Sequence, residues 1–156
     1  MKKFQSNTAE QTYKFGYDMA KEARQGDVIA LIGDLGTGKT VFAKGFADGL
    51  GVSEPVTSPT FTIVCEYTQG SLPLYHFDVY RIDDPEELFE IGFEEYLYGG
   101  GVCLIEWADR IMDELPGQTA VVEIRKVPGE DVERRDILVW RKQEQTADCG
   151  IMRDAK

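Results

Sequence analysis

Two uninterrupted apolar runs stand out in the hydrophobic pattern of the chain. Residues 28–32 read VIALI, and residues 102–105 read VCLI. Strands that are buried on both faces in the middle of a parallel sheet have this continuous apolar character, whereas half-exposed strands alternate between apolar and polar residues. The two runs therefore predict central, parallel strands.

Four segments carry apolar residues at helical spacing, and start or stop signals mark their ends. Thr8 can cap the first segment, Gly51 ends the second, and Asp84-Pro85-Glu86 starts the third. We predict helices over residues 9–24, 39–50, 84–98 and 110–115.

Four further strands are predicted on either side of short turns. Segments 61–67 and 72–80 have a short connection, which is typical of an antiparallel hairpin. Segments 119–127 and 135–140 are separated by a turn at 128–131. The whole pattern predicts an α/β fold: a central mixed sheet with parallel core strands, helices on both faces and antiparallel hairpins at the edges.

A glycine-rich segment lies between the first apolar run and the second predicted helix. It fits the pattern G-x-x-x-x-G-K-[ST] through Gly33, Asp34, Leu35, Gly36, Thr37, Gly38, Lys39 and Thr40. Glycines let backbone N–H groups approach phosphate oxygens, and the helix start adds positive potential. We predict a P-loop of an NTPase-like domain, with Lys39 on the β- and γ-phosphates and Thr40 on Mg²⁺. The strand-to-helix context disfavours a chance match in a tight turn.

A P-loop enzyme also needs a carboxylate across the site, to hold Mg²⁺ or to orient water. Glu106 directly follows the apolar run 102–105 and is the better candidate, whereas Asp78 in segment 72–80 is the second. The alternative for both is a carboxylate at a solvent-exposed strand end.

Three further residues have weaker signals. Thr60 follows Ser58-Pro59 in the place where related NTPases have a switch that senses the γ-phosphate, or it belongs to a rigid turn. His76, the only histidine, is interpreted as a packed, hydrogen-bonded residue rather than a base. Trp107 either packs on the core or stands exposed near the nucleotide.

Composition narrows the class of protein. Apolar residues make up 42% of the 156 residues and charged residues 29%, as in soluble globular proteins of one domain. We predict a single P-loop ATPase domain over residues 1–142 and a disordered polar tail over 143–156. The net charge of −11 makes direct nucleic-acid binding unfavourable.

Cysteine spacing and hydropathy indicate the compartment. Cys65, Cys103 and Cys149 are odd in number and have neither C-x-x-C nor metal-ligand spacing. No apolar run reaches the roughly 18 residues that a membrane-spanning helix needs. We therefore expect a cytoplasmic protein without membrane association.

Five segments together resemble the TsaE (YjeE) family of bacterial P-loop ATPases, over about residues 8–140. They are 33–40, 58–62, 76–81, 84–88 and Glu106-Trp107. The resemblance implies a partner-dependent ATPase that uses ATP and Mg²⁺. It also implies that the protein is required, with the TsaD and TsaB proteins, for threonylcarbamoyladenosine modification of tRNA next to the anticodon.

The resemblance also assigns roles to single residues. Thr40 and Glu106 match the family's magnesium-binding positions, and Asp78 matches an acidic position important for hydrolysis. Glu10 and an arginine near Arg134 match positions that contact the nucleotide. We therefore take Lys39, Thr60, Asp78 and Glu106 as the candidate catalytic residues. The family usually has proline after Glu106-Trp107, whereas this chain has Ala108.

Other functions stay open at this point. A small-molecule kinase shares the P-loop, but such kinases usually carry an arginine-bearing lid, and Arg81 is the only arginine between Arg24 and Arg110. A docking module gated by ATP, without significant hydrolysis, is a further alternative. A GTPase is disfavoured because the chain has no N-K-x-D segment to read guanine.

Overall fold

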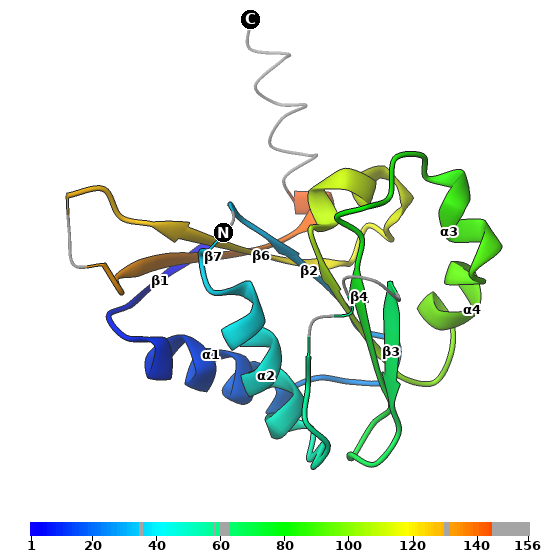
Figure 1. The fold of residues 1–156 in the computed structure, drawn as a ribbon, viewed down its shortest axis with the longest axis horizontal. Coiled ribbons are helices and arrows are strands. Elements are labelled where there is room, and N and C mark those ends of the chain that lie inside the picture. The colour runs from blue at the N-terminus through cyan, green and yellow to red at the C-terminus, as the bar shows by residue number, and fades with distance from the viewer. Residues whose placement is uncertain (35, 58, 60–62, 130–131, 145–156) are drawn as a thin grey trace, which may run out of the picture.

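The computed structural model describes residues 1–34, 36–57, 59, 63–129 and 132–144 (Figure 1). Its strands are β1 (Lys2–Ser6), β2 (Val28–Ile32), β3 (Val64–Tyr67), β4 (Leu74–Asp78), β5 (Val102–Glu106), β6 (Ala120–Lys126) and β7 (Arg135–Arg141). Its helices are α1 (Ala9–Lys21), α2 (Lys39–Gly49), α3 (Glu86–Glu90), α4 (Phe93–Leu97) and the 3₁₀ helix η1 (Ala108–Glu114).

The strands form one seven-stranded sheet in the order β1-β7-β6-β2-β5-β4-β3. Strand β2 runs parallel to its neighbours β5 and β6, and β4 runs parallel to β5. The pairs β3–β4, β6–β7 and β1–β7 are antiparallel. The predicted mixed sheet is confirmed, because the two apolar runs lie side by side at its centre and the antiparallel pairs lie toward its edges.

Alternate residues of the central strands pack on opposite faces of the sheet. Ile29 and Leu31 share a core with residues of α1 and α2, whereas Val28 and Ala30 share a core with residues of α3, α4 and η1. In Figure 1, α1 and α2 lie below the sheet and α3 and α4 lie to its right. The prediction of helices on both faces is confirmed, and the double burial explains why β2 is apolar throughout.

Glycines bring helices α1 and α2 into backbone contact. A Cβ at Gly45 would collide with the carbonyl oxygen of Tyr13, and a Cβ at Gly16 would collide with that of Phe42. Because the obstacles are backbone atoms rather than flexible side chains, only glycine fits at these two positions. The contact holds α1 tightly against the helix that follows the P-loop.

Two elements differ from the sequence predictions. The strand β1 is not predicted, because four of its five residues are exposed and leave no apolar pattern to detect. The predicted single helix over 84–98 is wrong, since the chain forms α3 and α4 with a break between them. Gly92 causes the break with a left-handed φ of +74°, which interrupts the helical path.

The single domain over residues 1–142 stays a prediction. Residues 142–144 form a helical turn after β7, and the rest of the predicted tail, 145–156, lies outside the described residues. Within the part that is described, Cys65 and Cys103 form no disulfide. None of the helices in that part is long and apolar enough to cross a bilayer.

Candidate nucleotide-binding site

The glycine-rich loop connects the C-terminal end of β2 to the start of α2. Gly33, Gly36 and Gly38 have φ values of +145°, +76° and +106°, which residues with a side chain rarely adopt. At Gly33 a Cβ would also lie 2.5 Å from the carbonyl oxygen of Ile124 on β6. The loop therefore has glycine where its backbone requires it. Leu35 lies outside the described residues.

Lys39, the first residue of α2, folds back over the loop. Its ammonium group donates hydrogen bonds to the carbonyl oxygens of Gly33 at 2.6 Å and Asp34 at 2.8 Å. The same group lies 4.0 Å from the centre of the Trp107 ring. Burial lowers the pKa of Lys39, and four nearby carboxylates oppose this shift. The loop thus carries a buried cation where a phosphate group would need one.

Thr40 at the start of α2 and Glu106 at the end of β5 face each other. Glu106 ends β5 and pairs in register with Leu31 of β2. The Thr40 hydroxyl oxygen lies 3.5 Å from Glu106 Oε1, and Glu106 is only 2% exposed. Two oxygens that bind one Mg²⁺ at about 2.1 Å lie no more than about 4.2 Å apart, so this pair could share one ion. The structure brings the two predicted metal ligands together, and their binding of Mg²⁺ stays a prediction.

The second oxygen of Glu106 contacts His76 on the neighbouring strand β4. His76 Nε2 lies 2.6 Å from Glu106 Oε2, and both side chains are buried. His76 is therefore packed and hydrogen-bonded, as predicted. Its partner is the candidate metal carboxylate, and that relationship was missed because no spacing in the sequence encodes a contact between strands.

Asp78 ends β4 and pairs in register with Glu106 on β5. It is 5% exposed, and its Oδ1 accepts a hydrogen bond of 3.0 Å from the backbone N–H of Tyr80. The two candidate carboxylates therefore lie at the same end of adjacent parallel strands. Both side chains are buried, so the alternative of a carboxylate at a solvent-exposed strand end is wrong for both.

Trp107 follows Glu106 with a φ of +60°, which is uncommon for a bulky residue. Its ring packs against the core that contains α3 and α4, contacts Lys39, and lies 4.7 Å from the Tyr80 ring. Of the two alternatives, the structure shows packing on the core, and this half-buried side chain also contacts the P-loop lysine. A position near a bound nucleotide stays a prediction. Ala108, where the family usually has proline, is buried and begins η1.

The start of α1 borders the loop. Glu10 is exposed in the first turn of this helix. Two residues later, the Thr12 methyl carbon lies beside Gly38, 3.7 Å from the position that a Cβ would take there. The predicted contact of Glu10 with the nucleotide stays a prediction, as does the role of Thr60, which lies outside the described residues.

An arginine contacts the loop from the start of β7. Arg135 Nε donates to the carbonyl oxygen of Thr37 at 2.9 Å, and its Nη2 lies 3.4 Å from that of Gly36. The resemblance implied a nucleotide-contacting arginine near Arg134 without deciding between neighbours, because only the strand register, which pairs Arg135 with Lys126 of β6, distinguishes Arg134 from Arg135. The contact of Arg134 with the nucleotide stays a prediction.

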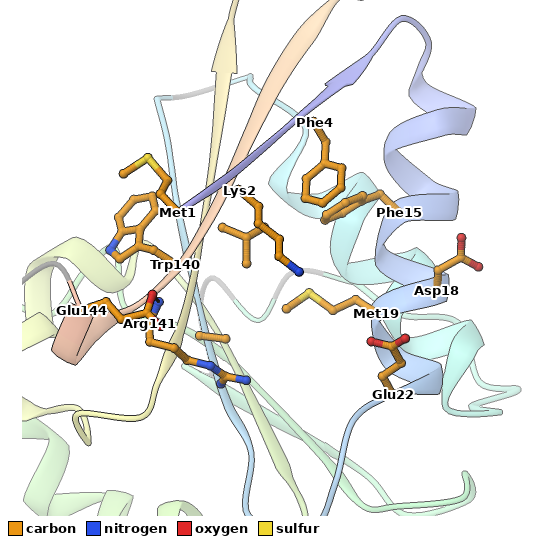
Figure 2. Close-up of a pocket in the computed structure, with 12 residues that line it drawn as sticks. Met1, Lys2, Phe4, Phe15, Asp18, Met19, Glu22, Trp140, Arg141 and Glu144 are labelled. Atoms are coloured by element: carbon orange, nitrogen blue, oxygen red, sulfur yellow. Dashed lines mark hydrogen bonds between the residues drawn. The ribbon is translucent and has the colours of Figure 1, made fainter.

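Two open clefts border these elements. One of about 700 Å³ lies beside the loop, and its lining includes Asp34, Thr37, Trp107, Asp109 and Lys126. The other, of about 750 Å³, lies between α1 and the strands β1 and β7, where Figure 2 shows Phe4 and Phe15 beside each other. Of the predicted site residues that the structure describes, Gly33, Asp34 and Thr37 line the first cleft and none lines the second.

The residues present fit a nucleotide with Mg²⁺. Thr40 and Glu106 offer the oxygen ligands that Mg²⁺ prefers. In the loop, the buried hydroxyl of Thr37 makes no hydrogen bond to any residue that the structure describes. No group of three or more His, Cys, Asp or Glu side chains in the described ranges could hold a metal ion. Mg²⁺ needs no such group at a phosphate site, because one or two protein ligands usually bind it together with the substrate phosphates.

Known proteins resemble the chain in sequence and in structure. The family model of the threonylcarbamoyl adenosine biosynthesis protein TsaE matches residues 6–137. The tRNA threonylcarbamoyladenosine biosynthesis protein TsaE of Bacillus subtilis (strain 168) is 48% identical over 129 residues, or 83% of this chain and 80% of the relative. The protein of the same name from Treponema pallidum (strain Nichols) is 46% identical over 120 residues, which are 77% of this chain and 88% of the relative.

A solved structure shares the fold. The crystal structure of YdiB from Bacillus subtilis matches with a TM-score of 0.77 at 38% sequence identity, covering 99% of this chain and 95% of that chain. The family model covers well over half of the chain, and its match agrees with the relatives and with the shared fold. The chain therefore belongs to the TsaE family of threonylcarbamoyl adenosine biosynthesis proteins.

Proposed function

We propose that this chain binds and hydrolyses ATP with Mg²⁺ and acts with the TsaD and TsaB proteins in threonylcarbamoyladenosine modification of tRNA next to the anticodon. The observation that carries the proposal is the 3.5 Å separation of Thr40 Oγ1 and Glu106 Oε1 beside a loop covered by Lys39. Membership of the TsaE family supports the place of the chain in this modification.

The loop and Lys39 bind the phosphates of ATP. Lys39 exchanges its hydrogen bonds to the carbonyl oxygens of Gly33 and Asp34 for contacts with phosphate oxygens, which are charged and therefore stronger acceptors. The loop N–H groups and the start of α2 stabilise the same negative charge. The ammonium group lies over the loop already, so the exchange requires only a small movement.

Thr40 and Glu106 hold the metal ion. When bound, Mg²⁺ neutralises negative charge that develops on the phosphate oxygens during transfer to water. Asp78 lies at the end of the strand beside Glu106 and orients the attacking water. Thr60 senses the γ-phosphate, so that ATP sets the conformation of its loop and thereby controls docking to the partner proteins.

The partners bind the tRNA. The chain carries 28 acidic and 17 basic residues, and its negative charge opposes contact with a phosphate backbone. Hydrolysis by the chain alone is slow and increases when TsaD and TsaB are present. TsaD is the subunit that transfers the threonylcarbamoyl group, and the whole assembly works in the cytoplasm.

Release of phosphate from ATP, measured for the purified chain alone and with TsaD and TsaB, tests the proposal. We expect stimulation by the full set of partners and its loss in Lys39→Ala and Glu106→Ala. Lys44→Ala on α2 and Glu90→Ala on α3 change exposed residues of the same type and serve as matched controls.

Four outcomes would contradict the proposal. Unchanged turnover in Lys39→Ala would show that the P-loop lysine is not needed for hydrolysis. Unchanged turnover in Glu106→Ala would show that Glu106 is not the metal carboxylate. Rapid phosphate transfer to a small acceptor without the partners would indicate a kinase. ATP-dependent docking without any hydrolysis in the complete assembly would indicate a binding module.

A further inference from the structure

His76 is a buried polar residue on the sheet face that also carries Glu106. It is 0% exposed, and its register neighbours are Cys65 on β3 and Leu104 on β5. Leu74, two residues earlier on the same face, is also fully buried. An imidazole without a function would cost desolvation energy in such surroundings, where an apolar side chain would pack equally well.

The two oxygens of Glu106 have different partners. Oε2 lies 2.6 Å from His76 Nε2, while Oε1 lies 3.5 Å from the hydroxyl of Thr40. A carboxylate that binds a metal carries no proton and only accepts hydrogen bonds, so Nε2 must be the donor. The contact with His76 therefore fixes one oxygen and leaves the other aimed at Thr40.

The other ring nitrogen of His76 supports this assignment. Nδ1 is buried and makes no hydrogen bond in the described part of the chain. A bare lone pair at this position costs less than an N–H group without an acceptor. The neutral ring with its hydrogen on Nε2 satisfies the contact with Glu106 and leaves no donor unpaired.

We propose that His76 is a positioning residue that holds the Glu106 carboxylate in the orientation required to bind Mg²⁺ opposite Thr40. This inference rests on the proposed function, in which Glu106 is the metal carboxylate. Ligands of metal ions are commonly held by a second layer of hydrogen bonds, and loss of such a partner typically weakens metal affinity by about 10- to 100-fold.

Two substitutions separate the hydrogen bond from the volume of the ring. His76→Phe keeps an aromatic ring but removes the donor, whereas His76→Gln keeps a terminal N–H that can reach Glu106. The readout is the Mg²⁺ concentration that produces half of the metal-induced increase in affinity for a fluorescent ATP analogue. Affinity for the analogue without metal and the thermal unfolding temperature report separately on the P-loop and the fold.

We expect His76→Phe to need about 10- to 100-fold more Mg²⁺, with unchanged affinity for the analogue in the absence of metal. His76→Gln should stay within about threefold of the unsubstituted protein. A normal Mg²⁺ requirement in His76→Phe would overturn the inference. An equal loss in both variants would also overturn it, because the hydrogen bond would then not be the property that matters.

Glu106→Gln distinguishes failure of this inference from failure of the proposed function. If the metal effect on affinity persists in Glu106→Gln, Glu106 is not the metal carboxylate and both claims fail. If the effect is lost in Glu106→Gln but normal in His76→Phe, only the role of His76 is wrong. The variants therefore distinguish failure of the inference alone from failure of both claims.

A measurement on the unsubstituted chain keeps the inference falsifiable even if His76→Phe does not fold. His76 is the only histidine, so its ring signals in a nitrogen-15 NMR spectrum need no assignment. We expect the form with hydrogen on Nε2, and a shift of the Nε2 signal when Mg²⁺ is added to the protein with the ATP analogue. Hydrogen on Nδ1 alone, or no shift, would overturn the inference.

Discussion

The ammonium group of Lys39 lies 4.0 Å from the centre of the Trp107 ring, although 68 positions separate the two residues in the chain. Such contacts between a cation and an aromatic ring contribute about 0.5–2 kcal/mol. They are weaker than a pairing of Lys39 with phosphate, so the lysine can leave the ring when a nucleotide enters the loop. Trp107 is therefore placed to report on binding.

We expect ATP to change the tryptophan fluorescence of the chain, because the charge next to the Trp107 ring moves. The chain has two tryptophans, and the second, Trp140, lines the cleft beside α1 instead. Trp107→Phe should abolish the change, whereas Trp140→Phe should preserve it. A change that survives Trp107→Phe would come from Trp140 and would contradict the expectation that Trp107 reports on binding.

Arg135 should stiffen the P-loop before any nucleotide binds. Its guanidinium contacts the carbonyl oxygens of Thr37 and Gly36, and this leaves the loop N–H groups available to phosphate. Arg135→Ala should weaken ATP binding by about 5- to 30-fold, equivalent to about 1–2 kcal/mol. It should also speed hydrogen exchange of the loop amides in the protein without nucleotide.

Arg134→Ala is the matched control for that experiment. Arg134→Ala leaves both hydrogen bonds of Arg135 to the loop carbonyl oxygens in place, so it can weaken ATP binding without changing exchange in the free loop. We therefore expect exchange in Arg134→Ala to match the unsubstituted chain. If exchange of the loop amides is as slow in Arg135→Ala as in Arg134→Ala, Arg135 does not stiffen the loop.

Gly45→Ala should destabilise the fold through the contact between α1 and α2. Its Cβ would collide with the carbonyl oxygen of Tyr13, so the two helices would have to separate. Overpacking of this kind costs about 1–3 kcal/mol, which urea unfolding can measure. In the control Gly117→Ala, the new Cβ meets only the side chain of Gln143 at 3.4 Å, and we expect a change within about 0.5 kcal/mol. Equal stability of both variants would contradict the packing described for α1.

Cys103 should resist alkylation at ordinary pH. It is buried, and burial raises the pKa of its thiol to about 12. The thiol therefore stays protonated until the pH approaches that value, and at pH 8 only about one part in ten thousand is the reactive thiolate. Mass spectrometry after iodoacetamide treatment should find Cys103 unmodified in the folded chain and modified in urea. Rapid modification without urea would show that the thiol is not buried.

The central fold could be predicted from sequence because its signals are strong and local. The apolar run of β2 has the bounds 28–32 in both the pattern and the structure. Strands β2 and β5 are parallel neighbours, so they end at the same edge of the sheet. Because the P-loop and Thr40 follow β2 and Glu106 ends β5, the two side chains lie beside each other. Continuous burial and strand direction therefore place the two candidate metal ligands together.

The remaining features depend on tertiary contacts that leave no local pattern. Strand β1 is exposed along most of its length and owes its existence to pairing with β7. The contact of His76 with Glu106 and that of Arg135 with the P-loop arise only when separate strands are brought into register. Gly92 occurs within an otherwise helical pattern, where a glycine is often tolerated, and here it adopts a left-handed conformation that divides the helix.

The most direct test of the proposed site is a crystal structure of the chain with Mn²⁺ in place of Mg²⁺ and a non-hydrolysable ATP analogue, with the metal located by its anomalous scattering. We expect the phosphates in the loop 33–40 and one metal ion bound by the Thr40 hydroxyl and by Glu106, directly or through a water molecule. A metal ion bound to Asp78 without Glu106, or phosphates outside the loop, would contradict the proposed site.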